Sequence, residues 1–220
     1  MEQGRISVPH EGAPTVCEPV CEERTAPRFT LLIRAAKVVT PAGEFICVIR
    51  DVSQSGVSLR GFHALPEGGP HWLELQTGER YAIEPVWSRG LEAGYRFAGA
   101  VDVATLIAEA GRYPKRRLRL NIGLEVELAF LGGRVRADVI NLSQQGARIE
   151  CDTLLALDQP LRLCSGLLPE VRARVRWRSK REYGLVFDDT FTLSQLATFA
   201  AGVQAPALLA QPACAAALRR

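Results

Sequence analysis

Two pairs of arginines carry the residue types in this chain best suited to binding an anionic ligand. Arg24 and Arg28 lie four residues apart in RTAPR, and Arg112 and Arg116 lie four apart in RYPKR. A guanidinium group is a planar fork that matches phosphate oxygens and the O6 and N7 atoms of guanine, and it also stacks on flat rings. Such pairs could bind a ligand that carries phosphates and bases, whereas a single isolated pair is usually a solvated surface feature.

A hexapeptide follows each arginine pair at a similar distance. DVSQSG begins 23 residues after Arg28, and NLSQQG begins 25 residues after Arg116. Its Asp or Asn and its Ser can accept hydrogen bonds from guanine or hold the arginines in place, and its Gly lets backbone approach a ligand. The alternative is a structural turn, with the polar side chains bonded to nearby backbone and the glycine at positive φ. The residues concerned are Asp51, Ser53 and Gly56 in the first copy and Asn141, Ser143 and Gly146 in the second.

The hexapeptides belong to a longer internal repeat with a period of 90 residues. A single shared hexapeptide could arise by chance, but several matches in one register indicate a duplicated domain. The further matching pairs are Trp87 and Trp177, Gly94 and Gly184, and Phe97 and Phe187.

Alternating apolar residues predict β-strands with one buried face. Residues 124–130 and 171–177 both alternate with period two, and the apolar positions of the second run include Trp177. Glycines punctuate the runs where hairpin turns would fall. Several short antiparallel strands in ~80 residues predict a small closed or nearly closed barrel, which removes exposed edges.

Each repeat ends in a predicted short amphipathic helix. Asp102 and Thr192 are good N-cap residues, and apolar residues at helical spacing begin directly after them at Val103 and Leu193. We expect the apolar stripe of each helix to pack on its own domain.

The arginine pair followed some two dozen residues later by [D/N]xSxxG resembles the PilZ family, and it occurs twice, over residues 24–110 and 112–200. We call these the first and second repeats. The resemblance implies a mainly β fold of two tandem six-stranded antiparallel barrels, each closed by a short C-terminal α-helix. It also implies a non-enzymatic effector that binds cyclic di-GMP, a bacterial second messenger, and needs no other cofactor. By position, the ligand-binding residues would be Arg24, Arg28, Asp51, Ser53, Gly56, Arg112, Arg116, Asn141, Ser143 and Gly146.

The two repeats differ around their arginines. In the first repeat a proline directly precedes Arg28, as it often does in the family, whereas Pro114 of the second repeat sits one place earlier. Aligning the prolines would pair Lys115 with Arg28 and Gly111 with Arg24, and lysine offers a point charge without the bidentate fork. We therefore expect the first repeat to bind more tightly.

Composition favours a globular protein without a membrane span. The 220 residues are 47% hydrophobic, and the formal net charge of +3 is too mild to demand nucleic acid or a membrane. No apolar run reaches ~18 residues and the polar start has no secretory core, so we expect a cytoplasmic protein. Cys17 and Cys21 form CEPVC without a second pair at zinc spacing, so no metal site is predicted. The expected domains are a disordered segment at 1–23, barrels at 24–110 and 111–202, and an Ala-rich tail at 203–220.

The sequence therefore predicts a cyclic di-GMP receptor that signals to a downstream protein partner. The alternative is a PilZ-fold protein-interaction module that binds no nucleotide, which the offset proline of the second repeat favours. A nucleic-acid-binding barrel is suggested only by the alternating arginines of one strand, whose simpler interpretation is a solvated outer face, so nucleic acid is not the expected partner. These arginines are Arg172, Arg174, Arg176 and Arg178.

Overall fold

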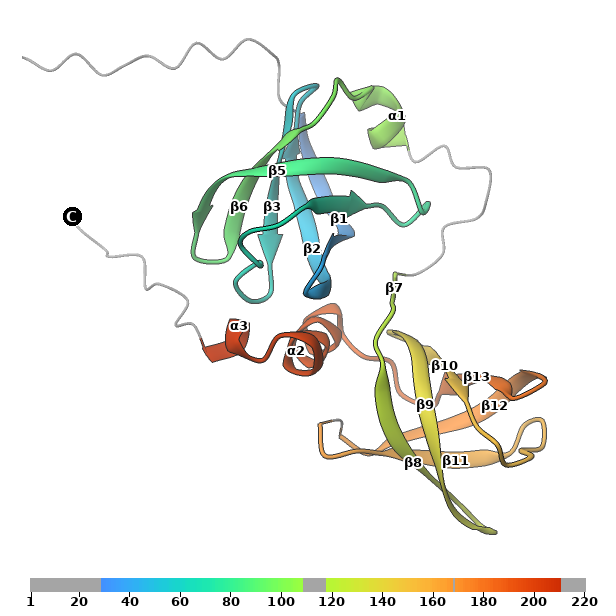
Figure 1. Cartoon of the computed structure of the whole chain (residues 1–220). Helices are drawn as coiled ribbons and strands as arrows, with labels where there is room; N and C mark the ends of the chain where they lie inside the picture. Colours follow the sequence, from blue (N-terminus) through green and yellow to red (C-terminus); the bar gives the residue numbers. More distant parts are fainter. Residues whose placement is uncertain (1–28, 109–117, 168, 211–220) are drawn as a thin grey trace, which may run out of the picture.

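The computed structural model describes residues 29–108, 118–167 and 169–210. This part of the chain is mainly β and forms two closed six-stranded antiparallel barrels, one after the other along the sequence (Figure 1). A helix follows each barrel. The fold class that the sequence predicts is therefore confirmed.

The first barrel closes in the order β1-β2-β3-β6-β5-β4, with β4 pairing back onto β1. Its interior is lined by apolar side chains that alternate along the strands, and Ile49, Leu59 and Leu73 have no exposed surface. Burial of these side chains is the main stabilising contribution to such a barrel. Its strands are β1 (Phe29–Thr40), β2 (Gly43–Val52), β3 (Gly56–Gly61), β4 (His71–Glu74), β5 (Arg80–Arg89) and β6 (Glu92–Phe97).

The second barrel repeats this pairing order with strands from later in the chain. It runs β10-β13-β12-β11-β8-β9 and closes between β9 and β10. An additional two-residue strand, β7 (Arg119–Leu120), pairs with the last two residues of β9. The other strands are β8 (Leu124–Phe130), β9 (Gly133–Ser143), β10 (Gly146–Glu150), β11 (Pro160–Cys164), β12 (Val171–Ser179) and β13 (Glu182–Phe187).

The two tryptophans of the repeat lie on the outside of the barrels. The alternation of residues 171–177 predicts a buried Trp177, but this prediction is wrong, because the pairing of β12 with β13 shifts register between Val175 and Trp177. Such a bulge adds one residue to one strand and re-aims the side chains that follow. The Trp177 side chain is consequently 42% exposed, and the same register shift leaves Trp87 45% exposed in the first barrel.

The predicted helices form, with the predicted caps. Asp102 Oδ1 accepts a hydrogen bond of 3.0 Å from the backbone N–H of Ala104 at the start of α1 (Val103–Ala108). Thr192 and Gln195 make a reciprocal capping box at the start of α2 (Leu193–Gln204). Within the described ranges, no helix is long and apolar enough to cross a membrane.

Helix α2 lies between the two barrels rather than on one of them (Figure 1). Its Ala200 belongs to the core of the second barrel, while Ala201 belongs to the core of the first. Ile46 of β2 in turn joins the core of the second barrel. The prediction that the apolar stripe of this helix packs on its own domain is confirmed, since Leu196, Ala197 and Ala200 belong to the core of the second barrel, but the helix also contacts the first barrel through Ala201. The short α3 (Ala207–Ala210), inside the Ala-rich tail, also packs on the first barrel through Leu208.

Candidate functional site

A pocket of about 570 Å³ opens on the second barrel where the NLSQQG hairpin meets β12 and β13. We call it the arginine pocket, because three arginines line it and its lining, all within the described residues, contains no carboxylate. A pocket of this size is within the ~300–1,000 Å³ typical of small-molecule sites. Its lining residues are Arg119, Asn141, Ser143, Gln145, Gly146, Ala147, Arg148, Arg176, Trp177, Gly184, Leu185 and Val186.

Strand pairing brings the lining residues together from five strands, β7, β9, β10, β12 and β13. Arg148 of β10 stands opposite Asn141 of β9 on one side and opposite Gly184 of β13 on the other. Gly184 stands opposite Trp177 of β12. Because directly opposed residues in antiparallel strands have Cβ atoms ~5 Å apart, this row forms one continuous surface across the barrel wall.

Arg148 is held in place but retains a free donor. Its Nη2 lies 2.6 Å and 2.5 Å from the two carboxylate oxygens of Glu182. Its Nε is buried and has no hydrogen-bond partner. A buried donor without a partner is costly, so an anionic oxygen that reached this atom would bind favourably.

Trp177 provides a flat apolar surface beside the arginines. A Cβ atom added at Gly184 would overlap the Trp177 indole, so the ring covers the glycine across the strand pair. Arg176 lies at the bulge next to it and also lines the pocket. An exposed indole beside guanidinium groups is suited to stacking with a base.

The serine and glycine of each hexapeptide build the hairpin itself. Ser143 Oγ donates to the Gly146 carbonyl at 3.0 Å, and Ser53 Oγ donates to the Gly56 carbonyl at 3.3 Å. The turn interpretation is therefore confirmed for both serines. The prediction of a positive φ at the hexapeptide glycine is wrong, because neither Gly56 nor Gly146 is among the described glycines with positive φ, such as Gly43. Glycine is instead required because a Cβ at Gly146 would overlap a main-chain carbonyl of β13.

Replacing Gly146 by alanine is therefore expected to lower the free energy of unfolding by about 1–3 kcal/mol, since the overlap with the Leu185 carbonyl forces a backbone shift. Urea denaturation measures this loss. Gly123→Ala is the matched control, because a Cβ there meets nothing within 4 Å, and it should change stability by less than about 0.5 kcal/mol. Equal losses in the two variants would contradict this account of the glycine.

The structure brings together part of the predicted site in the second repeat. Asn141, Ser143 and Gly146 all line the arginine pocket. Asp51, Ser53 and Gly56 occupy the corresponding hairpin of the first barrel. The four arginines of the two RxxxR pairs, Arg24, Arg28, Arg112 and Arg116, lie outside the described residues.

Two of the pocket arginines have no equivalent in the first repeat. At a spacing of 90 residues, the counterparts of Arg148 and Arg176 are Ser58 and Val86. A comparison of the repeats for similarity overlooks such residues, since they are by definition where the repeats differ. The signal that could have found them was the excess of arginine in the second repeat.

The alternating arginines of β12 do not form one free basic face. Arg176 lines the arginine pocket, and Arg174 Nε lies 3.7 Å from Asp188 Oδ1. Arg172 stands opposite Arg162, which itself pairs with Glu170 at 3.3 Å. This arrangement gives little support to a nucleic-acid surface.

The described residues contain no cluster of three or more potential metal ligands. Cys17 and Cys21 of CEPVC lie outside these residues. Burial raises the pKa of the Cys47 thiol to about 12, which keeps it protonated near neutral pH.

Comparison with known proteins finds one family that the second repeat matches. Residues 112–204 match the family model of the PilZ domain. No curated protein matches the chain.

Among solved structures, similar folds include PlzA of Borreliella burgdorferi in complex with c-di-GMP, at 11% identity over 78% of this chain and 88% of that one, with a TM-score of 0.32. YcgR of Escherichia coli in complex with c-di-GMP is 11% identical over 74% of this chain and 80% of that one, with a TM-score of 0.31. The inhibitor of motility MotI/DgrA of Bacillus subtilis is 14% identical over 76% of this chain and 93% of that one, with a TM-score of 0.31.

Proposed function

We propose, from the match of residues 112–204 to the PilZ domain model and from the lining of the arginine pocket, that this chain is a non-enzymatic receptor that binds cyclic di-GMP in that pocket of its second barrel. One observation carries the proposal: the motif residues Asn141, Ser143 and Gly146 share a pocket with three arginines and an exposed indole. The ligand has two phosphate charges and two guanines. Guanidinium forks match the phosphate oxygens and guanine edges, and the indole of Trp177 offers a stacking surface.

The RYPKR pair can reach the same pocket. Arg116 precedes Arg119 by three residues, so even a fully extended chain places the two Cα atoms no more than about 11 Å apart. Arg119 lines the pocket and is fixed opposite Ser143. We therefore assign Arg112 and Arg116 to the ligand site of the second barrel.

The second barrel, rather than the first, is the proposed site. This reverses the ranking expected from the prolines, because Ser58 and Val86 replace two arginines of the pocket in the first repeat. Serine and valine supply neither charge nor a bidentate fork. The first repeat thus keeps the hairpin motif but lacks two of the arginines that surround it in the second repeat.

The alternative of a protein-interaction module fits the first barrel. Val86 and Trp87 are 62% and 45% exposed there, at the positions that correspond to Arg176 and Trp177. Exposed apolar side chains of this kind are suited to contact with a protein. A receptor that binds nucleotide through one barrel and a downstream protein through the other would combine the two functions.

Calorimetric titration of the full chain with cyclic di-GMP tests the proposal. We expect micromolar or tighter binding, and much weaker binding of GTP and GMP, because neither of these presents two guanines and two phosphates together.

The double variant Arg112→Ala, Arg116→Ala should lose most of the affinity for cyclic di-GMP, whereas Arg24→Ala, Arg28→Ala should retain it. Absence of binding by folded protein would reject the receptor and leave the interaction module. The opposite ranking of the double variants would move the site to the first barrel.

A further inference from the structure

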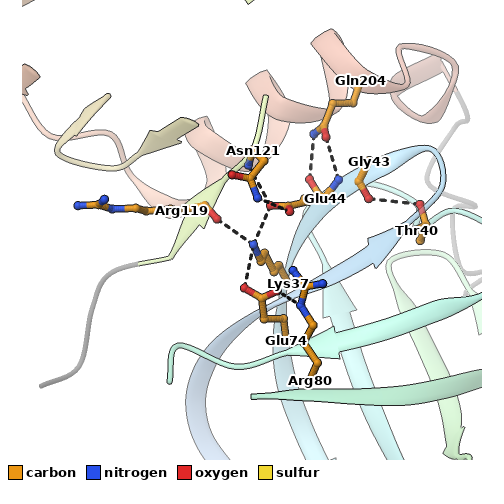
Figure 2. A network of polar contacts seen from close by, with 9 residues as sticks. All are labelled: Lys37, Thr40, Gly43, Glu44, Glu74, Arg80, Arg119, Asn121 and Gln204. Carbon is orange, nitrogen blue, oxygen red and sulfur yellow. Dashed lines mark hydrogen bonds and ion pairs between the residues drawn. The ribbon is translucent and has the colours of Figure 1, made fainter. Parts of the chain in front are cut away.

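A buried lysine joins the two barrels. Lys37 of β1 is 3% exposed, and its Nζ lies 2.7 Å from Glu44 Oε2 and 2.9 Å from Glu74 Oε1 (Figure 2). The same Nζ donates a hydrogen bond of 3.0 Å to the backbone carbonyl of Arg119 in β7. An ammonium group has three N–H donors, so these three partners use all of them.

The carboxylate of Glu44 binds Asn121, the residue that directly follows β7. It accepts a hydrogen bond of 3.0 Å from the backbone N–H of Asn121 and one of 2.7 Å from Asn121 Nδ2 (Figure 2). A side chain on each of two strands of the first barrel thus binds the main chain at each end of β7. On its other side, β7 pairs with β9 through only two residues, Arg119 and Leu120.

Helix α2 makes a separate contact between the barrels. Gln204 Nε2 donates to the Glu44 carbonyl at 2.9 Å, and the Glu44 N–H donates to Gln204 Oε1 at 2.8 Å. These bonds involve the Glu44 main chain and do not touch β7. The connection through Lys37 and the connection through Gln204 can therefore be cut independently.

We infer that Lys37 is a positioning residue for the ligand site in the other barrel, an inference that rests on the proposed function. The carbonyl group of Arg119 is bound by Lys37, while its side chain lines the arginine pocket. If β7 moved, a buried ammonium N–H would lose its partner, which is strongly unfavourable. The first barrel thus fixes the main chain from which one guanidinium of the pocket extends.

A double-mutant cycle tests this role in the full chain. Lys37→Met should weaken cyclic di-GMP binding by roughly three- to tenfold, less than the tenfold or more expected for losing a charge-assisted bond to the ligand itself. Arg119→Ala removes the side chain from the pocket but keeps the carbonyl that Lys37 binds. If Lys37 acts by positioning Arg119, Lys37→Met should have little further effect in the Arg119→Ala background.

Two further variants separate positioning from general loosening of the junction. Gln204→Ala removes the two hydrogen bonds between α2 and the first barrel but leaves β7 bound, so its affinity should stay within roughly twofold of wild type. Asn121→Ala loosens β7 at an exposed residue, and it replaces Lys37→Met in the cycle if that variant does not fold, as judged by circular dichroism.

The outcomes are distinct. If wild type binds and the effects of Lys37→Met and Arg119→Ala are additive, the positioning role is wrong and the proposed function stands. If Gln204→Ala loses as much affinity for cyclic di-GMP as Lys37→Met, the positioning role is also wrong, since any loosening of the contact between the barrels would then weaken binding. If wild type does not bind cyclic di-GMP, both proposals fall.

Discussion

The double variant Arg148→Ala, Arg176→Ala is expected to bind cyclic di-GMP at least roughly a hundredfold more weakly than the wild-type chain. Both guanidinium groups line the arginine pocket, from different strands, and the Nε of Arg148 is a buried donor without a partner. Losing one charge-assisted hydrogen-bonding group costs about 1.5–3 kcal/mol, or roughly ten- to a hundredfold in affinity. Isothermal titration calorimetry of the full chain measures the change.

A charge-matched control distinguishes direct contact from the general field of the barrel. Arg134 pairs with Glu127 on the same barrel, and Arg172 lies on the same strand as Arg176, but neither lines the pocket. The double variant Arg134→Ala, Arg172→Ala also removes two positive charges, and it should change the affinity by less than roughly threefold at physiological salt. Similar losses in the two double variants would mean that net charge, and not the pocket, governs binding.

Replacing Lys37 by methionine is expected to lower the free energy of unfolding by about 3–5 kcal/mol, because it leaves Glu44 as a buried carboxylate without a cation and Glu74 with only the exposed Arg80. Their side chains are only 9% and 14% exposed, so water cannot replace the ammonium group effectively. Urea denaturation followed by circular dichroism measures the loss.

The other cation bound to Glu74 provides the control for this effect. Arg80 Nε lies 2.5 Å from Glu74 Oε2, but its side chain is 55% exposed. An ion pair with an exposed partner contributes about 0.2–1 kcal/mol, so Arg80→Ala should be several-fold less destabilising than Lys37→Met. Comparable losses would show that burial of the junction does not strengthen the Lys37 contacts.

Local patterns in the sequence were reliable where the physics is local. The alternation over residues 124–130 predicts a strand, and β8 occupies those residues. Asp102 and Thr192 cap the helices as predicted, since a cap depends only on the first turn that follows it. The alternation failed at Trp177, because a bulge in the pairing with β13 inserts one residue, and nothing in the spacing of β12 itself marks that position.

By itself, the sequence determined that this chain is a tandem repeat of small β-barrels, and it picked out Asn141, Ser143 and Gly146, which line the proposed site. Residue periodicity and repeat spacing contain that information directly, because side-chain alternation follows from the pleat of each strand. Only the tertiary structure decided which arginines join them. Arg119, Arg148 and Arg176 lie far apart in the sequence and meet because β7, β9, β10, β13 and β12 are neighbours in the closed sheet. The junction could not be predicted for the same reason, since Lys37 reaches Arg119 only when the two barrels pack together.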